Sequence, residues 1–198
     1  MTHFMLKKYY IILLMIITIA SIPTKTAYTT KIVAIVNDDV ITDTDVEDFE
    51  KAVCKLDKRF KCGTQNSRQM ALISLVESVL KKEHFKQIQI LNDKQINSGY
   101  GAYRKDVLKN INIPVANLSQ SFEDYLHVEY IWNIMVASQA QQQAITEKDI
   151  ENFISQNKIT NKNREQVKQL ILQEKANNIS QTTMAELKKF YLIDIKGL

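Results

Sequence analysis

The pattern of apolar and polar positions is strand-like in one short stretch and helical over most of the remaining chain. The stretch Lys31–Val53 begins with KIVAIV, whose branched side chains favour a pleated, half-buried surface. Asn37–Asp39 supplies side chains that tolerate turn geometry, which predicts a hairpin into a second short strand at Val40–Ile41. Because a two-stranded hairpin is only marginally stable in water, this pattern also requires a further strand from elsewhere in the chain.

Apolar positions at helical spacing dominate the chain after Thr42. Thr44 and Glu47 have the spacing of a capping box at the start of the first helical segment. Thr146 is a favourable N-cap for the segment that follows it. The predicted helical segments run from Thr42 to about Asp57, over 67–90, over 94–111, from Pro114 to the glutamines at 139–143, over 147–156, and from Arg164 to about Lys189.

Two of these segments contain residues that oppose a regular helix. Gly99 and Gly101 weaken the segment 94–111, and the polar run NNISQTT at 177–183 predicts a kink or break in the last helix. The tail Phe190–Ile195, FYLIDI, returns to strand character and would supply the missing third strand. The predicted fold is therefore mostly α, a multi-helix core domain with a small antiparallel sheet made by an N-terminal hairpin and a C-terminal strand.

The first 27 residues have the order of a secretory signal peptide. Lys7 and Lys8 precede the apolar run Tyr9–Ile19, and small and polar residues follow through Ala27. The run is shorter than the about 20 apolar residues that span a membrane. We expect cleavage between positions 20 and 27 and a periplasmic location, and an uncleaved anchor is the alternative that would leave the protein attached to the membrane.

The composition and net charge of the chain agree with a helix-rich globular protein and give no sign of a nucleic-acid partner. The chain has 198 residues, is 45% hydrophobic and contains four Gly and two Pro, which indicates a globular, helix-rich protein. Its formal net charge of +4 includes Lys7, Lys8 and Lys25 of the expected signal peptide, so the remaining chain is close to neutral. Proteins that bind nucleic acid usually present a strongly basic face, and no nucleic-acid partner is expected here.

Export affects the interpretation of the two cysteines, because disulfides persist outside the cytoplasm. Cys54 and Cys62 lie in CKLDKRFKC. One continuous helix would hold them about 12 Å apart, which is too far for a disulfide. If the helix instead ends near Asp57, the segment can fold back, and Gly63 would help that reversal. The sequence leaves a disulfide and two free thiols as open alternatives.

No motif of catalytic or metal-binding chemistry is recognisable. The cysteines form no CxxC pair, and no His and Cys cluster has zinc-site spacing. His84 and His127 each lie on a predicted helix with no second ligand or nucleophile at a useful spacing, which favours a structural role. The sequence therefore predicts no catalytic residue, no metal site and no cofactor.

The order of these parts resembles the SurA family of periplasmic chaperones and parvulin-type prolyl isomerases. Members typically begin with a VAxVN-x-x-VI-x-x-[ST]-[DE] run, matched here by Val33–Asn37, Val40–Ile41 and Thr44–Asp45. The resemblance continues through LISLVESVLKKEHFKQIQI and ITEKDIENF to the tail NREQVKQLILQEKANNISQTTMAELKKFYLIDI. It implies that 28–198 is one chaperone core, with a helical part at 28–157 completed by a C-terminal helix and strand at 164–195.

The sequence departs from the family pattern after the ITEKDIENF segment. In the family, one or two parvulin domains of about a hundred residues normally follow that helix. Here only Lys158–Asn163 separates it from the last helix, so no isomerase residue can be carried over. The resemblance then implies a holdase without catalysis, whose clients are unfolded outer-membrane or secreted polypeptides. A prolyl isomerase and a module that docks on one envelope partner are the alternatives.

An apolar groove between the helices and the small sheet would engage extended client segments. The aromatic residues considered for its lining are Tyr100, Tyr103, Phe122, Tyr125, Tyr130 and Trp132. Packing in the protein core is the competing interpretation for each of them.

Overall fold

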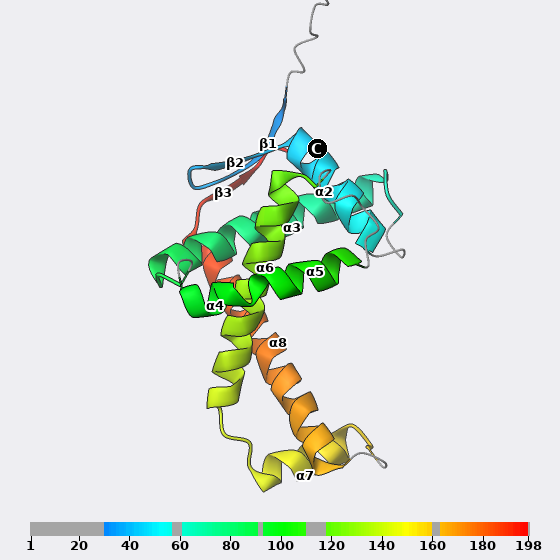
Figure 1. Cartoon of the computed structure of the whole chain (residues 1–198), viewed down its shortest axis with the longest axis vertical. Coiled ribbons are helices and arrows are strands. Elements are labelled where there is room, and N and C mark those ends of the chain that lie inside the picture. The colour runs from blue at the N-terminus through cyan, green and yellow to red at the C-terminus, as the bar shows by residue number, and fades with distance from the viewer. Residues whose placement is uncertain (1–29, 57–60, 91–92, 110–117, 160–162, 198) are drawn as a thin grey trace, which may run out of the picture.

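The computed structural model describes residues 30–56, 61–90, 93–109, 118–159 and 163–197 (Figure 1). The expected signal peptide and Pro114 lie outside the described residues, so those two predictions stay predictions. The strands are β1 (Ile32–Val36), β2 (Asp39–Thr42) and β3 (Ile193–Ile195). The helices are α2 (Asp43–Leu56), α3 (Gln65–Gln87), α4 (Lys94–Ser98), α5 (Tyr100–Lys109), α6 (Gln120–Gln142), α7 (Glu147–Gln156) and α8 (Arg164–Phe190).

The three strands form one antiparallel sheet in the order β2-β1-β3, so the C-terminal strand pairs with the first strand as predicted. Asn37 adopts a left-handed conformation with φ of 51°, which suits the tight turn between β1 and β2. The same residue joins the sheet to the tail, because its backbone N–H donates to the carbonyl of Leu192 over 3.0 Å. The predicted fold class is confirmed: the protein is mostly helical, with a small antiparallel sheet made by the N-terminal hairpin and the C-terminal strand.

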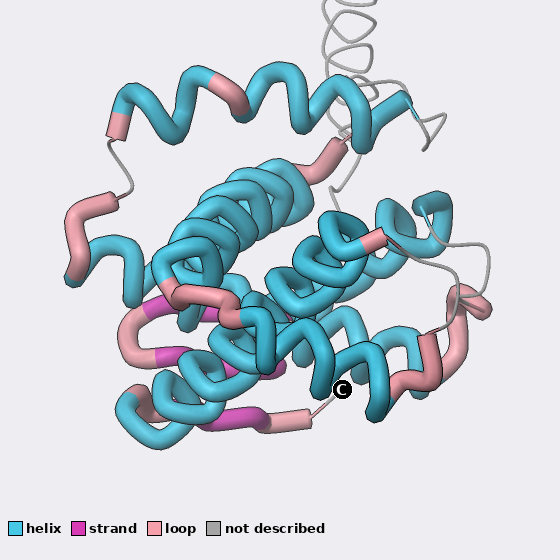
Figure 2. The backbone as a smooth tube through the Cα atoms, turned by 90° about the horizontal axis from the view of Figure 1, so that it is seen from below, coloured by secondary structure: helices cyan, strands magenta, loops and turns pink. Residues whose placement is uncertain are grey.

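One large hydrophobic core connects both ends of the chain. Val33 and Val36 of β1 are fully buried, and they share this core with Phe49 of α2, Ile131 of α6 and Leu187 of α8. In Figure 2, which views the molecule from below, the strands lie close together and helices pass in front of them. Burial of apolar side chains contributes roughly 25 cal/mol per Å², so this shared core, more than the three-residue strand β3, keeps the two ends together.

A second and smaller core lies at the opposite end of the molecule from the sheet. Figure 1 shows the lower part of α6 and the start of α8 leading to α7 at that end. Ile150 of α7 packs there with Val167 and Ile171 of α8. The N-cap of α7 forms as predicted, because the Thr146 side chain accepts a hydrogen bond from the backbone N–H of Asp149. The arm made by α6, α7 and α8 therefore has its own apolar centre.

The predicted single helix over 94–111 is wrong, because Gly99 separates α4 from α5. The hydroxyl of Tyr130, on α6, donates to the carbonyl of Ile96 over 2.8 Å and occupies the space beside Gly99. A Cβ atom at Gly99 would lie 2.2 Å from that hydroxyl oxygen. The break therefore follows from a tertiary contact that only glycine accommodates, in addition to the low helix propensity of glycine.

Gly99→Ala is expected to lower the free energy of unfolding by about 1 to 2 kcal/mol, because the methyl group would displace Tyr130 from its hydrogen bond. Gly101→Ala is the matched control, since a Cβ atom there meets nothing within 4 Å. The control should leave stability unchanged or raise it by up to about 1 kcal/mol through helix propensity. Urea unfolding of both variants measures the difference, and equal stabilities would contradict the proposed role of Tyr130.

Two further predictions about helix ends and continuity are also wrong. The capping box of α2 is made by Thr42 and Asp45, whose side chains each accept the other's backbone N–H, and not by Thr44 and Glu47. Helix α8 runs without a break through the polar run at 177–183. In that run, the Ser180 hydroxyl accepts a hydrogen bond from the indole of Trp132 over 2.8 Å. Packing against α6 therefore overrides the weak helix propensity of this run.

Candidate functional site

A groove of about 260 Å³ lies beside the free edge of β2. We call it the β2 groove. Strand β2 forms one wall, and α3, the first turn of α2 and the first turns of α6 form the rest. Its apolar lining consists of Val40, Ile41, Leu75, Val79 and Val128. The groove lies between the sheet and the helices, its lining is part apolar and part polar, and it contains none of the aromatic residues considered from the sequence.

The sheet order makes β2 an edge strand, with β1 on one side and the groove on the other. Ile41 is buried beneath the strand, with 4% of its surface exposed, whereas Val40 on the opposite face is 49% exposed. An uncovered strand edge presents main-chain donors and acceptors that another polypeptide can pair with. The β2 groove therefore combines an apolar floor with a polar backbone edge.

Charged side chains on the rim of the groove are mostly acidic. Asp39, Asp45 and Asp124 line it, and Lys82 is the basic residue among the lining side chains. Asp45 is held by the N-terminus of α2, because its carboxylate accepts from the backbone N–H of Thr42 over 3.0 Å. Lys86 also interacts electrostatically with Asp39, so the remaining excess of negative charge on the rim is small. Its sign favours a partner with basic side chains over an acidic one.

Three of the predicted lining residues gather on another face, between α5 and α6. The rings of Tyr100 and Tyr103 lie 5.7 and 5.2 Å from that of Tyr130, all three half-buried. Burial and the nearby Glu123 carboxylate raise the pKa of Tyr100 to about 12, so its hydroxyl stays protonated. The Arg104 guanidinium binds Glu123 and holds the pKa of that carboxyl below its usual range. These contacts dock α5 on α6 and do not reach the β2 groove.

The other three predicted lining residues belong to the main core. Phe122 is fully buried, and Trp132 is only 2% exposed. Tyr125 lies between Phe49 and Phe122, with its ring 4.8 Å from that of Phe49, and burial raises its pKa. Phe122 and Trp132 are enclosed by the core, and Tyr125 is partly buried against it. None of the three lines the β2 groove, and their contact with a client stays a prediction.

Both histidines of the described chain make structural contacts. Nε2 of His127 lies 2.6 Å from the amide oxygen of Asn97, and the ring packs on Tyr100. The ring of His84 lies against Phe85 and Trp132. Burial lowers the pKa of both histidines, so both are mainly uncharged at neutral pH.

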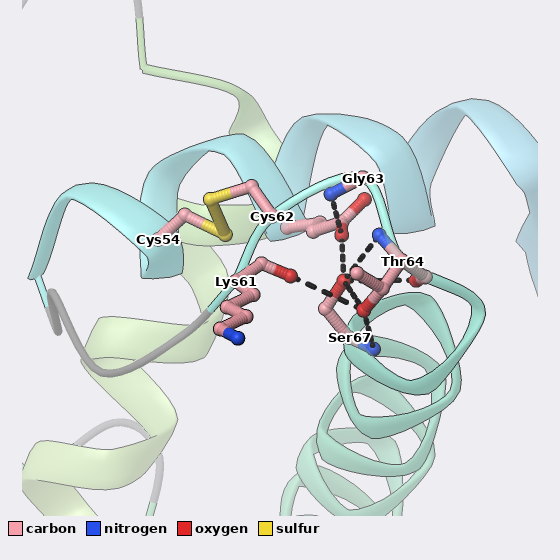
Figure 3. The surroundings of a disulfide bond; sticks show 7 residues. Cys54, Lys61, Cys62, Gly63, Thr64 and Ser67 are labelled. Atoms are coloured by element: carbon pink, nitrogen blue, oxygen red, sulfur yellow. Dashed lines mark hydrogen bonds between the residues drawn. A yellow bond between two sulfur atoms is a disulfide. The ribbon is translucent and has the colours of Figure 1, made fainter.

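A disulfide joins Cys54 to Cys62, with the two Cα atoms 5.8 Å apart (Figure 3). Helix α2 ends at Leu56, which permits the reversal that the sequence left as one of two alternatives. One turn earlier on α2, the buried carboxylate of Glu50 accepts hydrogen bonds from the Gly63 backbone N–H and from the Ser67 hydroxyl. Gly63 has a φ of 74°, which glycine adopts at little cost. Together these contacts fix the start of α3, the helix that forms the floor of the groove.

The groove residues that sequence reasoning missed are aliphatic, acidic and other polar side chains, and none is aromatic. Val79 and Val128 follow the helical period and look like ordinary core positions. The sequence signal that was available is Val40, an apolar residue in a strand that pairs on one side only. The aromatic residues considered from the sequence lie between α5 and α6 or in the core, away from this groove.

Comparison of the chain with models of known protein families gives no match, and comparison with curated proteins also gives none. Among the described helices, none is long and apolar enough to cross a membrane. Within the same residues, no group of His, Cys, Asp and Glu side chains is arranged to hold a metal ion.

Proposed function

We propose that this protein is a periplasmic holdase that binds unfolded outer-membrane or secreted polypeptides in the β2 groove, without catalysis. The observation that carries the proposal is a partly apolar recess of about 260 Å³ lined by the edge strand β2 and the helices beside it. That volume is below the roughly 300 to 1,000 Å³ of typical small-molecule sites, and it suits a few side chains of an extended chain.

Two further observations support the proposal. The run Lys31–Val53 resembles the opening of SurA-family chaperones, and the same run supplies β2 and the N-terminus of α2. The Cys54–Cys62 disulfide suits an oxidising compartment such as the periplasm. Both fit an exported polypeptide-binding protein.

The direct test is suppression of aggregation of an unfolded porin-type protein by the purified protein. Val79→Ser is expected to weaken suppression about three- to tenfold, because it removes apolar surface from the floor of the groove. Ile73→Ser is the matched control on the same helix, since Ile73 is 43% exposed and does not line the groove. The control should suppress aggregation as well as the unchanged protein, and urea unfolding checks that both variants are folded.

Absence of suppression at several-fold molar excess of the unchanged protein would refute the holdase proposal. Acceleration of proline-limited refolding would support an isomerase instead. Recovery of one stoichiometric partner from a cell envelope, in place of a mixed set of clients, would support a dedicated interaction module.

A further inference from the structure

The main-chain N–H and C=O of Val40, a residue that lines the β2 groove, point away from β1. On β1, the carbonyl of Val33 and the N–H of Asn37 pair with the C-terminal tail, at Lys196 and Leu192. The main-chain N–H and C=O groups of successive residues point to opposite sides of a strand. Those of Ile35 therefore also point to β3, and those of Ala34 and Val36 point to β2. Val40 lies opposite Ile35. It is therefore a non-hydrogen-bonded partner of β1, and its own N–H and C=O are directed to the free edge.

A further strand paired to the edge of β2 would direct every second side chain toward the floor of the groove. On β2, Ile41 faces inward and Val40 faces outward. A strand paired to β2 would continue this alternation, since successive side chains point to opposite faces. Its inward side chains would enter the recess formed by Leu75, Val79 and Val128. Backbone pairing and side-chain burial would thus be satisfied by the same extended segment.

The charges around the groove argue for one kind of occupant. Asp39, Asp45 and Asp124 outnumber Lys82 on the lining. If a second copy of this protein paired its β2 edge here, Asp39 would face the same acidic rim, and like charges placed opposite one another oppose association. An extended segment carrying lysine or arginine matches both the rim and the unpaired backbone.

We propose that the β2 groove takes an extended, basic polypeptide segment by strand addition, through main-chain hydrogen bonds to Val40 and apolar side chains inserted above α3. This inference rests on the proposed function and specifies its mode of binding. Strand addition obtains affinity from the main chain of the ligand, so binding should depend on alternate backbone N–H groups and only secondarily on side-chain identity.

The test uses eight-residue synthetic peptides of alternating threonine and valine with lysine at both ends, measured by fluorescence anisotropy. We expect the unmodified peptide to bind, and N-methylation of one alternate set of residues to weaken binding about tenfold, because one peptide N–H reaches the Val40 carbonyl. N-methylation of the other set should have little effect, because those groups face away from β2. Exchanging the end lysines for glutamates should weaken binding about three- to tenfold.

Val40→Pro provides the corresponding change in the protein. Proline removes the outward N–H and is tolerated on edge strands, so the fold should persist while peptide affinity falls about three- to tenfold. Val40→Thr retains the N–H and is the matched control. If both methylated peptides bind as well as the unmodified one, strand addition is refuted while polypeptide binding stands.

Two other outcomes are informative. If no peptide binds and aggregation is not suppressed, the proposed function itself fails. If Val40→Pro leaves peptide affinity unchanged but dissociates a dimer in analytical ultracentrifugation, the edge is occupied by a second copy, and the inference is overturned.

Discussion

Trp132→Ala is expected to lower the free energy of unfolding by about 3 to 5 kcal/mol. The indole is 2% exposed and packs near Phe85 on α3, with ring centres 6.1 Å apart. Its N–H donates to Ser180 on α8 over 2.8 Å. The substitution would therefore open a cavity among three helices and also leave the Ser180 hydroxyl without this donor.

Far-ultraviolet circular dichroism during urea unfolding is the appropriate measurement, because Trp132 is the sole tryptophan and fluorescence would be lost with it. Trp132→Phe separates the two contributions, since it keeps most of the packing and should lose only about 1 to 2 kcal/mol. Phe190→Ala is a control with a large aromatic side chain that is 74% exposed, and it should change stability by less than about 0.5 kcal/mol. Equal losses in Trp132→Ala and Phe190→Ala would show that the indole is not a packing centre.

The same variant tests why α8 is continuous. Ser180 lies in the polar run at 177–183, where the sequence alone predicts a break. If the contact with Trp132 holds this run helical, amide hydrogen exchange in the middle of α8 should accelerate in Trp132→Ala more than in the first turns of the helix. Uniform acceleration along α8 would instead indicate a global loss of stability.

The sheet could be predicted from the sequence because its signals are local. Branched residues at 32–36, a turn-forming Asn37 and the strand-like tail at 190–195 each identify an element without reference to the rest of the chain. Because an isolated hairpin is only marginally stable, the sequence predicts that the C-terminal strand pairs with it. The observed strand order β2-β1-β3 confirms this pairing.

The break at Gly99 and the continuity of α8 could not be predicted in the same way. Each depends on one side chain of α6, Tyr130 in the first case and Trp132 in the second, that lies more than 30 positions away in the sequence. Periodicity shows that both aromatic residues are on a helix, but it does not show which neighbour each one contacts.

The sequence predicted a groove between the helices and the sheet, but it did not predict which residues line the β2 groove. The sequence indicated an apolar groove between helices and sheet, and aromatic residues of α5 and α6 were considered for it. Four of those aromatic residues have clear structural contacts instead, with Tyr100 and Tyr130 docking α5, and Phe122 and Trp132 filling the core. The groove residues Val79 and Val128 have no local pattern that separates them from core positions.

Glu129→Leu is expected to lower the free energy of unfolding by about 2 to 4 kcal/mol. Glu129 on α6 binds the ammonium of Lys81 on α3, and the two side chains are only 19% and 10% exposed. Without the carboxylate, the ammonium would remain largely buried, with the Trp132 ring, 5.2 Å away, as a much weaker partner. The loss would arise mainly from an uncompensated buried charge, not from the ion pair as a source of net stability.

The double variant Lys81→Met with Glu129→Leu distinguishes these two explanations. If the uncompensated charge is the cause, replacing both partners by apolar side chains should restore stability to within about 1 kcal/mol of the unchanged protein. A thermodynamic cycle of the two single variants and the double variant, measured by urea unfolding, gives the coupling energy. Additive losses would mean that Lys81 and Glu129 contribute independently. A strong coupling would show that Lys81 and Glu129 act as one unit across the contact between α3 and α6.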